Sequence, residues 1–167
     1  MNILITGRPG VGKTTLIKKV IEDIDTKSGF FTTEIRGRGR RVGFAIETVD
    51  GTTGILAHVD IKSKYSVSKY RVNISDIEAV CVPSLEMERD LIVIDEIGKM
   101  ELFSDQFRNR VLQALGTGKV IATIMEQSHP FTDAIKNRDD VELVTVTEET
   151  RDELVDILKE KIKKNLV

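Results

Sequence analysis

Apolar residues recur along the chain in two patterns, short continuous runs and helical repeats, and their alternation predicts the order of the secondary-structure elements. Residues 2–6 form an apolar run typical of a buried strand, and a glycine-rich segment follows at residues 7–12. At residues 13–24, apolar side chains return at steps of three and four, which predicts an amphipathic helix. A strand, a loop and a helix in this order favour an α/β fold with a mostly parallel sheet.

The same rhythm returns in the second half of the chain. The apolar run at residues 91–94 predicts a second buried strand. Pro130 is a residue type common in the first turn of a helix, and Thr147 precedes the last apolar repeat as a helix cap would. The pattern predicts helices at residues 104–115, 130–137 and 149–164, and strands at residues 119–124 and 142–146.

The middle of the chain has a different character. Residues 30–60 are rich in Thr, Val, Ile and Gly, a composition typical of β-structure. The pair Asp50-Gly51 is a strong hairpin signal within this stretch. An antiparallel meander is therefore predicted, with strands near residues 30–36, 41–49 and 54–59.

Two segments follow the meander. The polar residues 62–73 predict a surface loop. An acidic first turn predicts a helix over about residues 75–88, although Pro83 predicts a kink or a split within it. Together the elements predict a single α/β domain over residues 1–167, with the meander at about residues 30–60 as an elaboration.

Composition and charge exclude several classes of protein. The chain has 25 basic and 27 acidic residues, and its formal net charge of −2 argues against a protein that coats nucleic acid. A single cysteine, Cys81, allows no intrachain disulfide and suits a reducing compartment, so we expect a cytoplasmic protein. Two histidines and one cysteine cannot build a Cys/His zinc site. The apolar runs are far shorter than the ~20 residues of a membrane span, so no membrane association is expected.

The glycine-rich segment carries the strongest chemical signal in the sequence. It matches every fixed position of the phosphate-binding P-loop pattern, G-x-x-x-x-G-K-[ST], between a predicted strand and a predicted helix. Glycines let successive backbone N–H groups approach phosphate oxygens, and the helix N-terminus adds a partial positive charge. The predicted nucleotide-binding residues are Gly7, Arg8, Pro9, Gly10, Val11, Gly12, Lys13, Thr14 and Thr15.

Three side chains of this segment have predicted roles. Lys13 is expected to place its ammonium on the β- and γ-phosphates and so to contribute to catalysis, and the Thr14 hydroxyl is expected to bind Mg²⁺. Thr15 is a candidate hydrogen-bond partner for the α-phosphate. A tight glycine turn that binds nothing is the alternative, and the strand, the spacing, the Lys and the Thr together argue against it.

The second motif is the apolar run at residues 91–94, which ends in Asp95 and Glu96 and matches the Walker B pattern. Taken alone, an apolar run that ends in Asp-Glu indicates only a strand that reaches the surface. Together with a P-loop upstream, it becomes a strong indication of a Walker B motif. Asp95 is expected to bind Mg²⁺, and both residues are expected to border the nucleotide. Glu96 is the candidate general base for an attacking water, a role worth roughly 10²–10⁴ in rate. Glu101 is its nearest competitor.

Two groups of basic residues leave alternatives open. Arg36, Arg38, Arg40 and Arg41 crowd one predicted hairpin, where they could contact phosphates, nucleic acid or a protein partner, or point into solvent. Arg138 follows a late helix, and we hypothesise that it reaches the γ-phosphate as a catalytic arginine, an effect of roughly 10³–10⁵ in rate. An ordinary basic helix end is the competing interpretation.

Longer segments around these motifs match a known family. They include residues 29–36 and, above all, residues 95–101, Asp-Glu-Ile-Gly-Lys-Met-Glu, since a general Walker B pattern does not specify the last five residues. The chain resembles the THEP1-type nucleoside-triphosphatases, with Thr150 where that family has Asn. The resemblance implies a P-loop NTPase fold, three layers α/β/α around a mostly parallel RecA-like sheet. It also implies Mg²⁺-dependent hydrolysis of several nucleoside triphosphates, with water activated by Glu96.

The expected activity is therefore hydrolysis of ATP, GTP and other nucleoside triphosphates to the diphosphate and phosphate. The sequence has no base-reading motif, so broad base specificity is the default, and a monomer is expected. One alternative is a small nucleoside or nucleotide kinase. The other is a nucleotide-dependent switch associated with RNA, DNA or a protein partner, and the near-neutral charge disfavours contact with nucleic acid.

Overall fold

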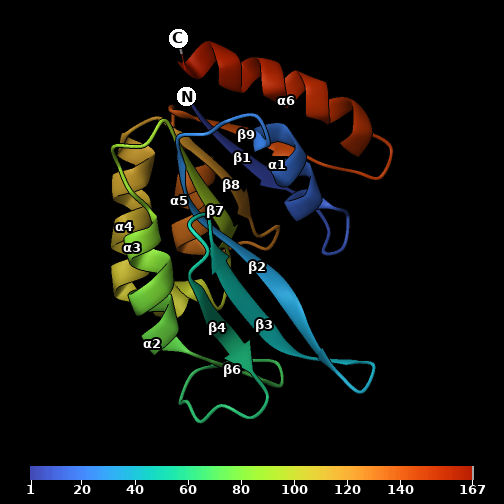
Figure 1. Ribbon diagram of the computed structural model, residues 1–167, viewed down its shortest axis with the longest axis vertical. Coiled ribbons are helices and arrows are strands. Elements are labelled where there is room, and N and C mark those ends of the chain that lie inside the picture. The colour runs from blue at the N-terminus through green and yellow to red at the C-terminus, as the bar shows by residue number, and fades with distance from the viewer. Residues whose placement is uncertain (167) are drawn as a thin grey trace.

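Five parallel strands form the centre of the computed structural model, which describes residues 1–166 (Figure 1). Their order across the sheet is β2-β7-β8-β1-β9, so β1 from the start of the chain lies between β8 and β9 from its second half. β1, β7 and β8 are short and mostly apolar, as expected for parallel strands covered on both faces. The bounds are β1 Asn2–Thr6, β2 Lys27–Gly37, β7 Leu91–Ile97, β8 Val120–Ile124 and β9 Val141–Thr145.

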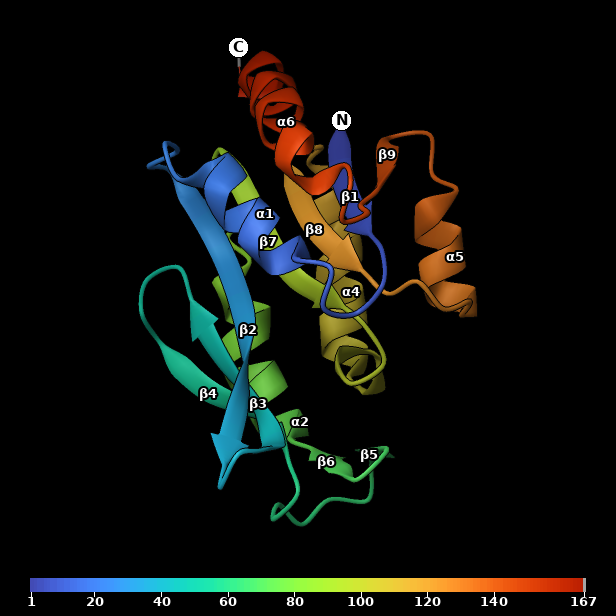
Figure 2. The ribbon, with the colours of Figure 1, turned by 90° about the vertical axis from the view of Figure 1, so that its right-hand side faces the viewer.

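Helices cover both faces of this parallel sheet, and the alternation of side chains along a strand decides which face each residue meets. Ile3 and Ile5 of β1 pack in one core cluster with residues of α1 and α6, whereas Leu4 between them packs with residues of α4 and α5. Figure 2 shows the resulting three layers. The helices are α1 Lys13–Ile21, α4 Asp105–Gly116, α5 Pro130–Lys136 and α6 Arg151–Leu166.

The antiparallel meander grows out of the parallel sheet through β2. Residues 27–30 of this long strand pair in parallel with β7, and residues 30–37 pair antiparallel with β3. The sheet continues through β3 Arg40–Thr48, β4 Thr53–His58, β6 Tyr70–Val72 and β5 Ser66–Val67. In both views this half extends away from the parallel strands (Figures 1 and 2). The predicted fold class is therefore confirmed, with a mostly parallel core and antiparallel strands at one side.

The segment at residues 62–73, predicted as a loop, contains the short strands β5 and β6. Tyr70 and Val72 are buried and the residue between them is exposed, a strand alternation too short to detect among polar neighbours. The Tyr70 hydroxyl accepts a hydrogen bond from Nε of Arg41, which ties β6 to β3 across the sheet. Tertiary contacts therefore stabilise strands that the local sequence does not favour.

The helix predicted at residues 75–88 is shorter and differently built. It consists of α2 Ile74–Asp76, a π-helical turn at Ile77–Cys81 and α3 Val82–Ser84. The N–H of Val82 bonds to the carbonyl of Ile77, five residues back, and Pro83 follows this wide turn without interrupting the chain's helical course. A π-turn is a known way to absorb such a break in an α-helix.

The last helix also differs from its prediction, since α6 begins at Arg151 rather than at residue 149. The carbonyl of Thr147, rather than its side chain, accepts the N–H of Arg151. Among residues 1–166, no helix combines the length and the apolar character needed to span a membrane.

Candidate functional site

The phosphate-binding segment predicted from the sequence joins the carboxyl end of β1 to the start of α1. Gly12 precedes the helix with a φ of 100°, a left-handed conformation that glycine adopts without strain. A Cβ atom at Gly7 would lie 2.7 Å from the carbonyl oxygen of Val146, which follows β9. Only glycine therefore allows the loop to lie this close to the backbone after β9. The two glycines therefore serve the loop conformation itself, as the pattern predicts.

Lys13 folds back over this loop. Its Nζ donates to the carbonyl of Gly7 at 2.9 Å and lies 3.7 Å from Oε2 of Glu96. The Lys13 side chain is only 11% exposed, so its ammonium is held between the loop and the end of β7. The structure thus brings together a cation and a carboxylate that are 83 residues apart in the sequence.

Asp95 lies at the centre of a buried polar cluster. Its Oδ2 accepts a hydrogen bond from the Thr14 hydroxyl at 2.8 Å, and its Oδ1 accepts one from the Thr123 hydroxyl at 2.8 Å. Burial raises the pKa of this carboxyl, and the hydrogen bonds from Thr123 and Thr14 act in the opposite direction. Thr123 was not among the predicted site residues, although a Thr inside the apolar strand β8 is a signal that could have identified it.

The donor atoms of this cluster suit Mg²⁺. The Thr14 hydroxyl and the Asp95 carboxylate supply hard oxygen ligands in contact with each other. In the part of the chain that the structure describes, no group of three or more His, Cys, Asp and Glu residues could hold a metal ion. A two-residue site is nevertheless the usual protein contribution to Mg²⁺, which keeps several waters or phosphate oxygens as ligands.

Two carboxyl groups follow Asp95 and differ in exposure. The Glu96 side chain is 35% exposed, whereas Glu101 is 3% exposed and accepts the N–H of Gly98 at 3.0 Å. Burial raises the pKa of Glu96 against the opposing charge of Lys13. Burial, together with the charge of Glu96, raises the pKa of Glu101 well above its ordinary value. Glu96 is therefore the carboxylate with better access from the cavity.

A cavity of about 690 Å³ opens beside Lys13 and Glu96. One side is formed by the phosphate loop, and the opposite side by meander residues such as Phe44 and Leu56. Met125 and other residues that follow β7 and β8 close a third side. This cavity lies where the carboxyl ends of the parallel strands meet the meander, the location at which open α/β sheets bind ligands.

A second cavity of about 510 Å³ lies on the other side of the phosphate loop. It is lined by residues 7–11 of the loop and by residues 145–149, which connect β9 to α6. Glu126 borders both cavities, as do Gly7 and Pro9. The loop therefore separates two spaces at the same edge of the sheet.

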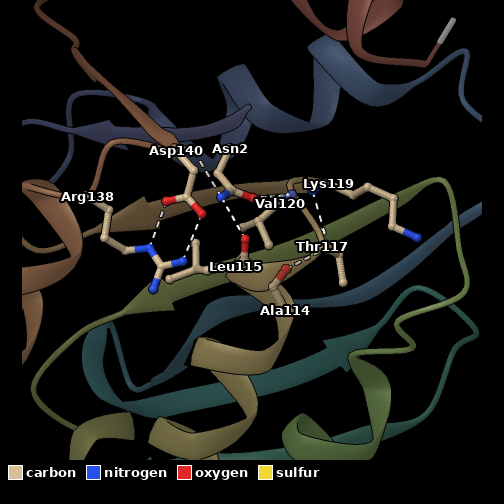
Figure 3. A network of polar contacts seen from close by, with 8 residues as sticks. All are labelled: Asn2, Ala114, Leu115, Thr117, Lys119, Val120, Arg138 and Asp140. Carbon is tan, nitrogen blue, oxygen red and sulfur yellow. Dashed lines mark hydrogen bonds and ion pairs between the residues drawn. The ribbon is translucent and has the colours of Figure 1, made fainter.

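The structure does not bring Arg138 to the phosphate loop. Nε and Nη2 of Arg138 each donate to Asp140 at 2.8 Å, and the carbonyl of Asp140 accepts from both the backbone and the side chain of Asn2 (Figure 3). Asn2 begins β1, so this network lies at the amino ends of the strands. The phosphate loop is at the other end, about 16 Å away along a five-residue strand.

Two of the four arginines of the basic hairpin, Arg36 and Arg41, form ion pairs within the meander. Arg36 and Arg41 both contact the Glu34 carboxylate, at 2.8 and 3.2 Å. The Arg41 guanidinium also lies over the rings of Phe44 and Tyr70, at 5.1 and 5.5 Å from the ring centroids. Arg41 thus has a structural role in the meander. Contact of the hairpin with phosphates, nucleic acid or a protein partner remains a prediction.

Comparison with known proteins agrees with this geometry. The fold and the two motifs define a P-loop protein, and residues 2–159 match the model of the NTPase family. The chain is 50% identical to the nucleoside-triphosphatase THEP1 of Thermotoga maritima, over 99% of this chain and 97% of that protein. It is 39% identical to a human cancer-related nucleoside-triphosphatase, over 92% of each chain.

A solved structure shows the same arrangement. The crystal structure of THEP1 from Aquifex aeolicus superimposes with a TM-score of 0.89 at 38% identity, covering 98% of this chain and 99% of that one. The chain therefore belongs to the NTPase family, and the family resemblance predicted from residues 95–101 is confirmed.

Proposed function

We propose that this protein hydrolyses nucleoside triphosphates to the diphosphate and inorganic phosphate, with Mg²⁺ and with little discrimination between bases. The observation that carries the proposal is the convergence of Lys13, Glu96 and the Thr14–Asp95 pair at one edge of the sheet. The NTPase family of the chain and the printed names of its relatives support the same activity.

The triphosphate is bound by the loop between β1 and α1. Backbone N–H groups of residues 10–13 and the N-terminus of α1 surround the phosphate oxygens, because the left-handed glycines turn the chain around them. Lys13 exchanges its contact with the Gly7 carbonyl for the β- and γ-phosphates, since both are acceptors and the phosphates carry the greater charge. Thr15 would donate a hydrogen bond to the α-phosphate.

Thr14 and Asp95 would hold the metal ion. When bound, Mg²⁺ would neutralise negative charge on the phosphate oxygens during phosphoryl transfer. Thr123 orients Asp95 through its hydrogen bond to Oδ1, which leaves Oδ2 directed toward Thr14. The hydroxyl of Thr123 therefore has a positioning role for the carboxylate.

Glu96 accepts the proton of the attacking water. Its carboxylate borders the cavity next to Lys13, and its raised pKa makes it a stronger proton acceptor than an exposed glutamate. The Lys13 charge nearby acts against this rise in pKa, because a cation favours the carboxylate form. Positioning and charge stabilisation then account for the reaction, as in other phosphoryl transfers.

The nucleoside is assigned to the second cavity, beside the connection from β9 to α6. Its described lining residues include no aromatic ring, and the connection contributes Thr145, Val146, Thr147, Glu148 and Glu149. A base therefore meets no aromatic stacking partner and no Asn or Gln side chain that could read its edge. This lining supports broad base specificity.

A panel assay tests the proposal. Purified protein is incubated with ATP, GTP, CTP and UTP with and without Mg²⁺, and phosphate release is measured. We expect release from all four within about tenfold of one another, and loss of release when EDTA removes the metal. Release from a single nucleotide would contradict the broad specificity, and undiminished release in EDTA would contradict the metal site.

A further inference from the structure

The cavity beside Lys13 and Glu96 has a wall that phosphate binding does not require. Phosphates need N–H groups and cations, and the loop side supplies these. The other two sides carry the side chains of Phe44, Leu56, Val67, Met100 and Met125, which offer neither. Apolar walls with a few polar groups at one end are typical of sites for small organic molecules, and about 690 Å³ is within the usual ~300–1,000 Å³ of such sites.

The elements that form this wall are held in place independently of the phosphate loop. Phe44 packs edge-on against Tyr70, with ring centroids 5.1 Å apart, and the Arg41 guanidinium covers both rings. Leu56 is 3% exposed within the meander core. The wall is therefore preformed, which lowers the cost of ordering it around a ligand.

The charges around the cavity select the kind of ligand. Apart from Lys13, the one cation among its described lining residues is Lys99, and the three acids Glu96, Glu101 and Glu126 border the same cavity. An anionic molecule such as a nucleoside monophosphate would lie beside Glu96 and Glu126, with Lys99 as the one lining cation that is not held at the phosphate loop, and would therefore meet more repulsion than attraction. A neutral molecule with an apolar ring avoids this cost and buries its ring against the Met and Phe side chains.

We propose that this cavity binds a neutral, hydroxyl-bearing aromatic molecule of about nucleoside size, which accepts the γ-phosphoryl group in place of water. The proposal rests on the proposed nucleoside-triphosphate site. Glu96 borders the same cavity, so a hydroxyl bound there occupies the place of the attacking water. The hydroxyl oxygen bonds to the γ-phosphorus, the bond from that phosphorus to the β–γ bridging oxygen breaks, and Glu96 takes the hydroxyl proton. The products are a phosphate monoester and the nucleoside diphosphate.

The test measures binding and transfer separately. The probes are adenosine, guanosine, cytidine, uridine, thymidine and pyridoxine, each of which is a neutral aromatic compound with a primary hydroxyl. Binding is measured by calorimetry on the Lys13→Ala protein, where nucleotide binding is expected to be lost and the apolar part of the cavity wall is unchanged. Transfer is measured with γ-labelled ATP and the unmodified protein, as labelled monoester against labelled phosphate. We expect saturable binding of at least one probe and labelled monoester from that probe.

Two substitutions fill the cavity and serve as a matched set. Val67→Trp and, from a different element, Met100→Trp are expected to reduce monoester formation at least tenfold. Ser66→Trp is the control for Val67→Trp, because Ser66 is exposed, adjacent in β5 and does not line this cavity. Thermal unfolding shows whether each variant is folded. If only one of the two cavity-filling variants folds, the monoester yield of that variant decides the result. Monoester lost in the filled variants but kept in the control supports the proposal.

Three results overturn it. The first is that no probe binds the Lys13→Ala protein and none yields monoester. The second is that a probe binds and changes phosphate release but no monoester forms, which removes the acceptor role. The third is that folded, filled variants still make monoester at the normal rate. Failure of the proposed hydrolysis gives a different result. In that case no nucleotide releases phosphate in an assay without any probe.

Discussion

The two ends of the parallel strands use buried polar groups in opposite ways. At the amino ends, Asn2 is fully buried, and its side chain donates to the carbonyls of Leu115 and Asp140 and accepts the N–H of Val120 (Figure 3). At the carboxyl ends, Asp95 and Glu101 are also buried, but burial raises the pKa of both carboxyls. The Thr6 hydroxyl at that end has no hydrogen-bond partner within residues 1–166.

The difference separates stability from function. Groups at the amino ends satisfy one another and hold β1, β8 and β9 together, so they have no capacity left for a ligand. Groups at the carboxyl ends are held close to one another at a cost in stability, and a charged ligand would relieve that cost. Perturbed carboxyl groups in a cleft are typical of functional sites for this reason. Substitutions at the two ends are therefore expected to have opposite signatures.

The largest effect is expected from Lys13→Ala at the carboxyl ends. Nucleotide binding and hydrolysis should both fall below detection, because Lys13 is a side-chain cation held against the phosphate loop and beside Glu96. The melting temperature should change by no more than about 2 °C, since Lys13 packs against polar groups. Calorimetric titration with ATP and a phosphate-release assay check this. Turnover that survives the substitution would contradict the assignment of the loop.

Glu96→Gln should slow hydrolysis by roughly 10²–10⁴, since the amide cannot accept the proton of the attacking water. Binding of ATP with Mg²⁺ should be retained or improved, because a negative charge near the γ-phosphate is removed. Single-turnover kinetics alongside equilibrium binding separate the two effects. If Glu96→Gln turns over normally, the general base is elsewhere, and Glu101→Gln becomes the next substitution to measure.

Asn2→Ala should give the reverse signature at the amino ends. It leaves the buried carbonyls of Leu115 and Asp140 and the N–H of Val120 without side-chain partners, at about 1–3 kcal/mol for a buried group left unsatisfied. We expect a melting temperature lower by several degrees, with kcat of the folded protein within about twofold of the original. Unfolding curves and phosphate release at a temperature below both transitions provide the measurement.

Glu101→Gln should stabilise the protein in a pH-dependent way. Because the pKa of Glu101 is raised on folding, the unfolded chain releases this proton at a lower pH than the folded one, and stability falls as pH rises above about 4.5. Glutamine has no proton to lose, and its amide oxygen can still accept the Gly98 N–H. The gain in melting temperature should therefore be larger at pH 8 than at pH 5, by a few degrees at about 2–4 °C per kcal/mol. An equal gain at both pH values would contradict this.

Arg138→Ala should have the smallest effect. The Arg138 side chain is 32% exposed and its Asp140 partner 42% exposed, so their ion pair is worth about 0.2–1 kcal/mol. Hydrolysis should stay within about twofold of the original rate, because Arg138 lies at the opposite end of the strands from the phosphate loop. A loss of tenfold or more in phosphate release would restore the original hypothesis.

Much of the candidate site could be predicted from the sequence because its signals are local. A phosphate loop is one short segment between a strand and a helix, and the carboxylates of residues 95 and 96 directly follow an apolar run. The two elements that were predicted wrongly, the loop at residues 62–73 and the helix at residues 75–88, share a physical cause. The short strands at residues 66–72 depend on pairing with β4, and the π-turn before Pro83 depends on packing rather than on propensity.

The sequence by itself determined the α/β order, the phosphate loop and the carboxyl pair, since each depends on residues within a few positions of one another. Only the tertiary structure decided that Thr123 contacts Asp95, that Arg138 lies at the amino ends, and that meander residues form the far wall of the cavity. These contacts join residues far apart in the chain. They depend on the order and direction in which strands pair across the sheet, which local periodicity does not encode.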